Sequence, residues 1–63
     1  MSYTVHNHFG QFVAYYTFGS GKYQIRLDDG SNTLEPYRFT NQNIALAVAV
    51  IVDGWLEIEE EEE

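Results

Sequence analysis

The longest apolar stretch of the chain extends from Ile44 to Val52 and contains no polar side chain. As a helix, the stretch has one face at the i, i+3, i+4 and i+7 spacing, made of Ile44, Ala47, Val48 and Ile51. As a strand, it alternates large and small side chains, and Asp53-Gly54 is a hairpin turn into Trp55. The β-branched residues favour the strand.

Three alanines and a polar Asn-Gln-Asn lead-in favour the helix instead, from about Asn41 to Val52. Thr40 or Asn41 is the expected N-cap, because a short side-chain oxygen accepts a hydrogen bond from a free backbone N–H at that position. Gly54 is expected to end the helix in the left-handed conformation, which glycine adopts without steric cost.

The segment before this run has the period-two pattern of strands. A first strand is predicted over Tyr3 to Phe9, followed by a hairpin of two strands, Phe12 to Phe18 and Lys22 to Asp28, around a Ser20-Gly21 turn. That turn sets the register of the hairpin: Phe18 faces Tyr23, Tyr16 faces Ile25, and Ala14 faces Leu27. This register puts seven residues on one apolar face: Phe12, Ala14, Tyr16, Phe18, Tyr23, Ile25 and Leu27.

The remaining strands are shorter. Leu34 to Phe39 is expected as a third strand at an edge, because Pro36 cannot donate a hydrogen bond to a neighbouring strand. Trp55 to about Glu59 is the expected last strand. The element order predicts one α+β domain over residues 1–59, an antiparallel sheet with a helix on one face, and a disordered acidic tail over 60–63. A small all-β barrel is the alternative.

The apolar run also predicts association with another polypeptide. A helix that is apolar all round must be covered all round, and one small sheet covers one side of it. A chain of 63 residues without cysteine has no disulfides to stabilise a thin core, which leaves oligomerisation. A homodimer is therefore expected, with Leu46, Val50 and Trp55 as the self-association residues.

The sequence also bears on the cellular location of the protein and on the distribution of its charge. No basic start followed by an apolar core is visible, so no signal peptide is predicted, and the nine-residue run is much shorter than the ~20 residues that span a bilayer. A soluble, cytoplasmic protein is expected. The net charge of −7 is localised: three acids and three bases cancel before Asp53, and the other seven acids lie from Asp53 onward.

Candidate catalytic and metal-binding groups are few. His6 and His8 share a face of a strand and have the spacing to chelate a metal, but neither a cysteine nor a nearby acid in the sequence completes the set. Asp28 and Asp29 are adjacent, so on a strand they point to opposite faces, and a turn is the better interpretation. The segment 19–21 lacks the Lys-Ser/Thr of a phosphate-binding loop. No enzyme, cofactor or metal site is predicted.

Ten of the 63 residues are aromatic, as on the stacking surfaces of proteins that bind single-stranded nucleic acid. Three basic residues against ten acids argue against direct nucleic-acid binding, and a core or a protein interface is expected instead. The acids of the C-terminal segment have three interpretations: a solubilising tail, weak Ca²⁺ or Mg²⁺ binding, or a surface for a basic partner protein. The residues predicted for that last surface are Glu57, Glu59, Glu60 and Glu61.

Taken together, the small size, localised acidity, aromatic hairpin and strand-strand-helix-strand order resemble the small acidic inhibitors that bacteriophages encode against host or defence proteins. The resemblance covers size, charge and element order, without a shared motif. It implies a non-enzymatic protein that occupies a basic or nucleic-acid-binding surface of a host protein in the host cytoplasm. A structural subunit of a larger phage assembly is the alternative function.

Overall fold

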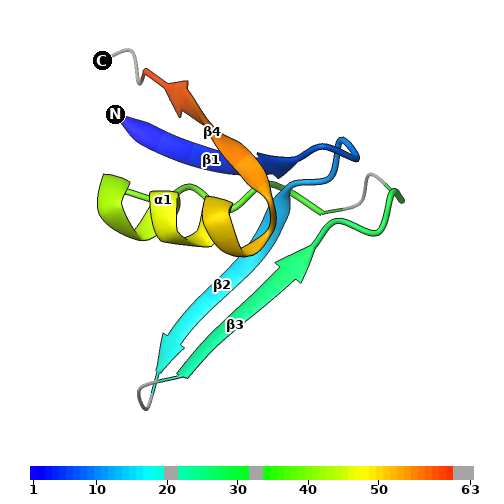
Figure 1. Ribbon diagram of the computed structural model, residues 1–63, viewed down its shortest axis with the longest axis horizontal. Coiled ribbons are helices and arrows are strands. Elements are labelled where there is room, and N and C mark those ends of the chain that lie inside the picture. The colour runs from blue at the N-terminus through cyan, green and yellow to red at the C-terminus, as the bar shows by residue number, and fades with distance from the viewer. Residues whose placement is uncertain (20–21, 32–33, 61–63) are drawn as a thin grey trace.

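A computed structural model describes residues 1–19, 22–31 and 34–60 of the chain (Figure 1). It contains one helix and four strands, in the order β1 (Ser2–Asn7), β2 (Val13–Gly19), β3 (Lys22–Leu27), α1 (Gln42–Ile51) and β4 (Gly54–Glu59). The α+β prediction is therefore confirmed, and the apolar run is a helix. The predicted acidic tail over 60–63 lies outside the described residues, except for the exposed Glu60.

The strands form two antiparallel ribbons, β1 with β4 and β2 with β3 (Figure 1). Single bridges link them: Tyr3 pairs with Phe39, and His6 pairs with Phe12. The predicted third strand over Leu34 to Phe39 is wrong, because this segment crosses between the ribbons. Tyr37 N donates to the Val13 carbonyl of β2 at 2.7 Å, and Phe39 exchanges two hydrogen bonds with Tyr3 of β1.

The hairpin register is confirmed near its turn and wrong at its base. Phe18 pairs with Tyr23 and Tyr16 with Ile25, as predicted, but Leu27 pairs with Val13 instead of Ala14. A β-bulge between Val13 and Tyr15 adds one residue to β2, which turns the side chains before it to the other face. Val13 is consequently fully buried. The Ser20-Gly21 turn itself lies outside the described residues.

The ends of the neighbouring elements are fixed by side chains. β1 stops at Asn7, not at the predicted Phe9, because the Asn7 side-chain oxygen accepts hydrogen bonds from the backbone N–H groups of Phe9 (3.0 Å) and Gln11 (3.1 Å) and forms a turn. Asn41 is the N-cap of α1: its side-chain oxygen accepts from the N–H groups of Asn43 (2.9 Å) and Ile44 (3.2 Å).

The helix ends differently from the prediction. Asp53, with φ of 55°, takes the left-handed conformation that was expected of Gly54. Gly54 is instead the first residue of β4 and pairs with Asn7. A Cβ on Gly54 would overlap the backbone carbonyl of His6 and lie 2.9 Å from the Cα of Asn7. A close approach of two backbones therefore requires the glycine.

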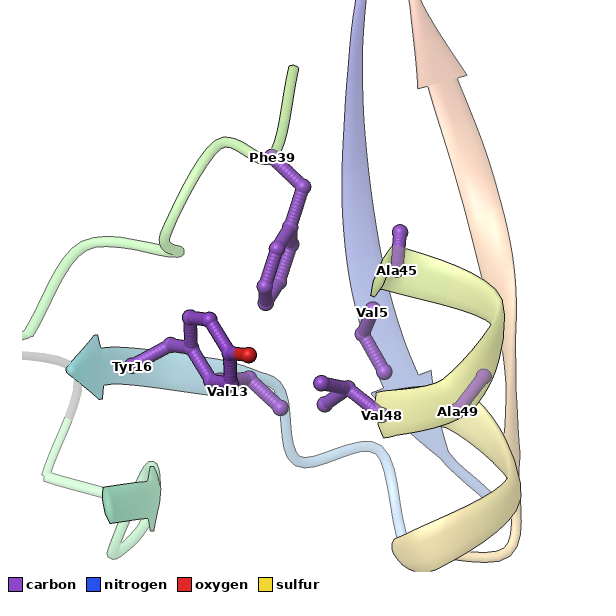
Figure 2. Packing of buried hydrophobic residues seen from close by; sticks show 7 residues of the cluster. All are labelled: Val5, Val13, Tyr16, Phe39, Ala45, Val48 and Ala49. Carbon is purple, nitrogen blue, oxygen red and sulfur yellow. The ribbon is translucent and has the colours of Figure 1, made fainter. Parts of the chain in front are cut away.

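The core lies where α1, β1, the base of β2 and the crossing segment meet (Figure 2). Val48 of α1 points toward Val5 of β1 and Val13 of β2, with Phe39 and Tyr16 beside them (Figure 2). The buried apolar residues are Val5, Val13, Tyr16, Phe39, Ala45, Val48 and Ala49.

The helix face at the i, i+3, i+4 and i+7 spacing is not the buried face of α1. Val48 is buried, but Ile44, Ala47 and Ile51 are exposed. The buried face contains Ala45, Val48 and Ala49, and Val52 packs at its end. Small side chains on this face allow the helix to approach β1 and β4 closely, and the larger residues of the run consequently face outward.

Candidate functional site

The outer helix face is the most exposed apolar surface of α1. We define it by Ile44, Leu46, Ala47, Val50 and Ile51, all of which are exposed. Val50 is 81% exposed, Ile51 66% and Leu46 47%. The predicted self-association residues Leu46 and Val50, four positions apart, are neighbours on this face.

No charged side chain interrupts the outer helix face. The helix sequence, Gln-Asn-Ile-Ala-Leu-Ala-Val-Ala-Val-Ile, has polar residues only in its first turn, at Gln42 and Asn43. A large exposed apolar surface on a small protein is typical of a protein–protein contact. The absence of charge means that a partner can cover this face without burying an unpaired ion.

Trp55, the third predicted self-association residue, lies on a different surface. Leu56 packs against the core beneath α1, so its neighbour Trp55 points to the opposite side of the β1–β4 ribbon. The structure therefore brings Leu46 and Val50 together and separates them from Trp55. Trp55 is 42% exposed.

Two histidines contact the Trp55 ring. His6 is the pairing partner of Trp55 in β1, and its ring stacks on the indole at 6.1 Å with an interplanar angle of 20°. His8, in the turn after β1, contacts the indole at 5.3 Å. We call this surface, made of His6, His8, Trp55 and Glu57, the Trp55 face.

The acids of β4 have partners within the chain. His6 Nε2 lies 3.2 Å from Glu57 Oε2 and 3.0 Å from Thr4 Oγ1. Arg38 Nε donates to Glu59 Oε2 at 2.9 Å. Both carboxylates are about half exposed, and such surface pairs contribute little to stability.

Glu60 and Glu61 complete the predicted acidic surface. Glu60 is exposed, whereas Glu61 lies outside the described residues. Trp55, Glu57 and Glu59 alternate along one side of β4, which places the two described acids of the strand on the side away from α1.

The remaining candidate groups form no reactive cluster. Among the residues that the structure describes, no three His, Cys, Asp or Glu side chains gather as metal ligands, and no pocket is present. Asp28 is buried, its carbonyl accepting from Gln11 Nε2 at 2.9 Å. Asp29 is exposed, and hydrogen bonds from the side chain and the backbone N–H of Ser31 hold its pKa below the usual value.

Sequence reasoning missed part of both surfaces. The helical spacing groups Ile44 and Ile51 with the buried Val48, and an all-apolar helix offers no polar residue that marks its outer side. The contact of His6 with Trp55 and Glu57 depends on the pairing of β1 with β4, which the spacing of residues cannot reveal. The shared face of His6 and His8 was the one available signal.

No protein family, curated protein or solved structure matches this chain. None of the helices in the described part of the chain is long and apolar enough to cross a membrane.

Proposed function

We propose that this protein is a non-enzymatic binding protein that works as a homodimer, with the outer helix face as the contact between the two copies. The observation that carries this proposal is the exposure of Val50 at the centre of an apolar, uncharged helix surface. Burial of a Val or Leu side chain stabilises a contact by about 1.5 to 3 kcal/mol, so several such residues favour association.

The absence of charge on the outer helix face favours a second copy of the chain as its partner. The outer helix face carries no charge of its own, so it offers nothing that attracts a charged partner. An apolar face without charges can pack against its own copy about a twofold axis without bringing like charges together, as an isologous dimer interface requires. Glu57 and Glu59 lie on the far side of the β1–β4 ribbon, which keeps the acids of the two copies apart.

The dimer is proposed to act as an inhibitor of the phage type, by occupying a basic or nucleic-acid-binding surface of a host or defence protein. The localised acids and their position on the side of β4 away from α1 support this class. An acidic surface that dimerisation leaves accessible is suited to a basic partner.

A structural subunit of a larger assembly is the second candidate. Within the described residues, β3 and β4 each have a neighbouring strand on one side only. Open strand edges accept further strands, so copies of this chain can associate through them as well as through the helix. Such growth gives large, concentration-dependent species instead of a closed dimer.

Light scattering after gel filtration tests the proposal with two variants. The native chain is expected at twice 7.3 kDa at about 100 μM. Val50→Glu is expected at 7.3 kDa, because an unpaired carboxylate buried in each copy weakens dimerisation by at least ~100-fold.

Phe9→Glu is the matched control. Phe9 is also a highly exposed apolar residue, but it lies in the turn after β1 and not on α1, so this variant should remain dimeric. A native chain that is monomeric at this concentration would overturn the homodimer. Large species that persist in Val50→Glu would favour the assembly subunit.

A further inference from the structure

Trp55 is an exposed aromatic residue with acids beside it on the same strand face. Glu57 is two residues further along β4, so the two side chains project from the ribbon about 7 Å apart. An indole ring and a carboxylate at this spacing suit a cationic side chain, which stacks on the ring and donates hydrogen bonds to the acid.

The described side chains around Trp55 hold the ring in place and leave the face net negative. His6 and His8 contact the indole, and Phe12 contacts the His6 ring edge-on at 6.2 Å. Among the charged residues nearby, Glu57 and Glu59 face one cation, Arg38. A positively charged segment is therefore the complementary partner.

The strand edge supplies a second element of recognition. β4 pairs with β1 on one side, and no described strand lies along its other side. An extended peptide can add there, with its alternate side chains on the Trp55 side of the ribbon. Residues two apart in such a peptide have the same spacing as Trp55 and Glu57.

We propose that the Trp55 face binds an extended basic segment of the partner protein through an arginine side chain, which stacks on Trp55 and pairs with Glu57. Arginine fits better than lysine, because its planar guanidinium stacks on a ring while it donates in parallel to a carboxylate. This inference rests on the proposed binding function and names the chemistry of the partner.

The internal partners of the acids do not prevent such binding. His6 contacts Glu57 through one ring nitrogen, and Arg38 pairs with Glu59 at the surface. An incoming guanidinium offers Glu57 a charged, two-pronged hydrogen bond in place of the single contact to a histidine. The exchange therefore favours the incoming arginine.

Trp55 is the single tryptophan of the sequence, so its fluorescence reports on this face alone. The test is a titration of the full chain with a synthetic peptide that has arginine at alternate positions, and with the same peptide carrying lysine. We expect the arginine peptide to change Trp55 emission in a saturable way and to bind several-fold tighter than the lysine peptide. Equal binding of both peptides would overturn the stacking role.

Variants separate the Trp55 face from the acidic tail. Glu57→Gln, a surface change of equal size, should weaken the arginine peptide about tenfold. The matched control neutralises the last two residues of the tail, with Glu62→Gln and Glu63→Gln together, and should bind within about twofold of the native chain. The reverse result, a loss with the neutral tail and none with Glu57→Gln, would overturn the proposal.

Val50→Glu distinguishes failure of this inference from failure of the dimer. The outer helix face and the Trp55 face lie on opposite sides of the β1–β4 ribbon. The variant should therefore bind the arginine peptide with unchanged affinity while it loses dimerisation. If peptide binding fails in a chain that dimerises normally, the Trp55 inference alone is wrong.

Discussion

Gly54 shows how one residue can join two elements. It follows the left-handed Asp53 at the end of α1 and begins β4, directly against the backbone of His6 and Asn7. The sequence marks Gly54 as special, but for a helix-ending conformation that Asp53 supplies. The requirement at Gly54 is space, and only the pairing of β4 with β1 reveals it.

Gly54→Ala is expected to lower the free energy of unfolding by about 3 kcal/mol or more, because the contact is with backbone atoms that cannot move aside. Gly30→Ala is the control: Gly30 has φ of 87°, but no atom lies within 4 Å of the position that an alanine methyl group would take, so strain alone should cost about 1 kcal/mol. Urea denaturation followed by circular dichroism measures both. Equal losses would contradict the steric explanation.

At the scale of the element, α1 has its small residues inside and its large residues outside. Ala45 and Ala49 lie against the ribbon, whereas Leu46 and Val50 face outward. The sequence identifies the helix through its alanines and polar lead-in, and Asn41 is one of the two N-caps that it offers. Hydrophobic periodicity cannot locate the inner face, because every residue from Ile44 to Val52 is apolar and the choice depends on how closely the sheet approaches.

Two variants, each replacing an alanine of α1 with leucine, test this arrangement. In the Val50→Glu background, where self-association does not contribute, Ala45→Leu should lower the free energy of unfolding by about 2 kcal/mol, since it overfills the core. Ala47→Leu, on the outer helix face, should change it by less than about 0.5 kcal/mol. Chemical denaturation compares the two, and a larger loss for Ala47→Leu would mean that the inner face is misassigned.

In the β2–β3 hairpin, too, local sequence predicts only the part of the structure that local contacts determine. The register next to the turn follows from the turn and the alternation, and it is correct for Tyr16 and Ile25. The bulge that moves Val13 into the core arises at the far end of β2, where Asp28 N bonds to the Phe12 carbonyl and Tyr37 N bonds to the Val13 carbonyl. The second of those contacts comes from a segment whose path no local pattern predicts.

At the scale of the whole molecule, apolar and acidic surfaces occupy opposite sides of one ribbon. The outer helix face is uncharged, and Glu57 and Glu59 project from the other side. The two proposed contacts therefore have different physical origins: hydrophobic burial for the dimer and charge attraction for the basic partner. Salt acts on them in opposite directions.

Raising NaCl from about 0.05 to 0.5 M should tighten dimerisation several-fold, because each copy carries a net charge of −7 and salt screens their repulsion. The same change should weaken binding of the arginine peptide. Analytical ultracentrifugation and Trp55 fluorescence follow the two equilibria. A dimer that weakens with salt would indicate that ion pairs, not the outer helix face, hold it together.

The pairing of β1 with β4 has a further consequence for how the molecule is assembled. Thr4 and Glu57, opposite each other in this ribbon, are 53 positions apart in the sequence. During synthesis β1 cannot pair with β4 until that last strand leaves the ribosome, while the β2–β3 hairpin can close early through local contacts. We therefore expect closure of the distant pair to be the slow step of folding, with one edge of β1 open until it occurs.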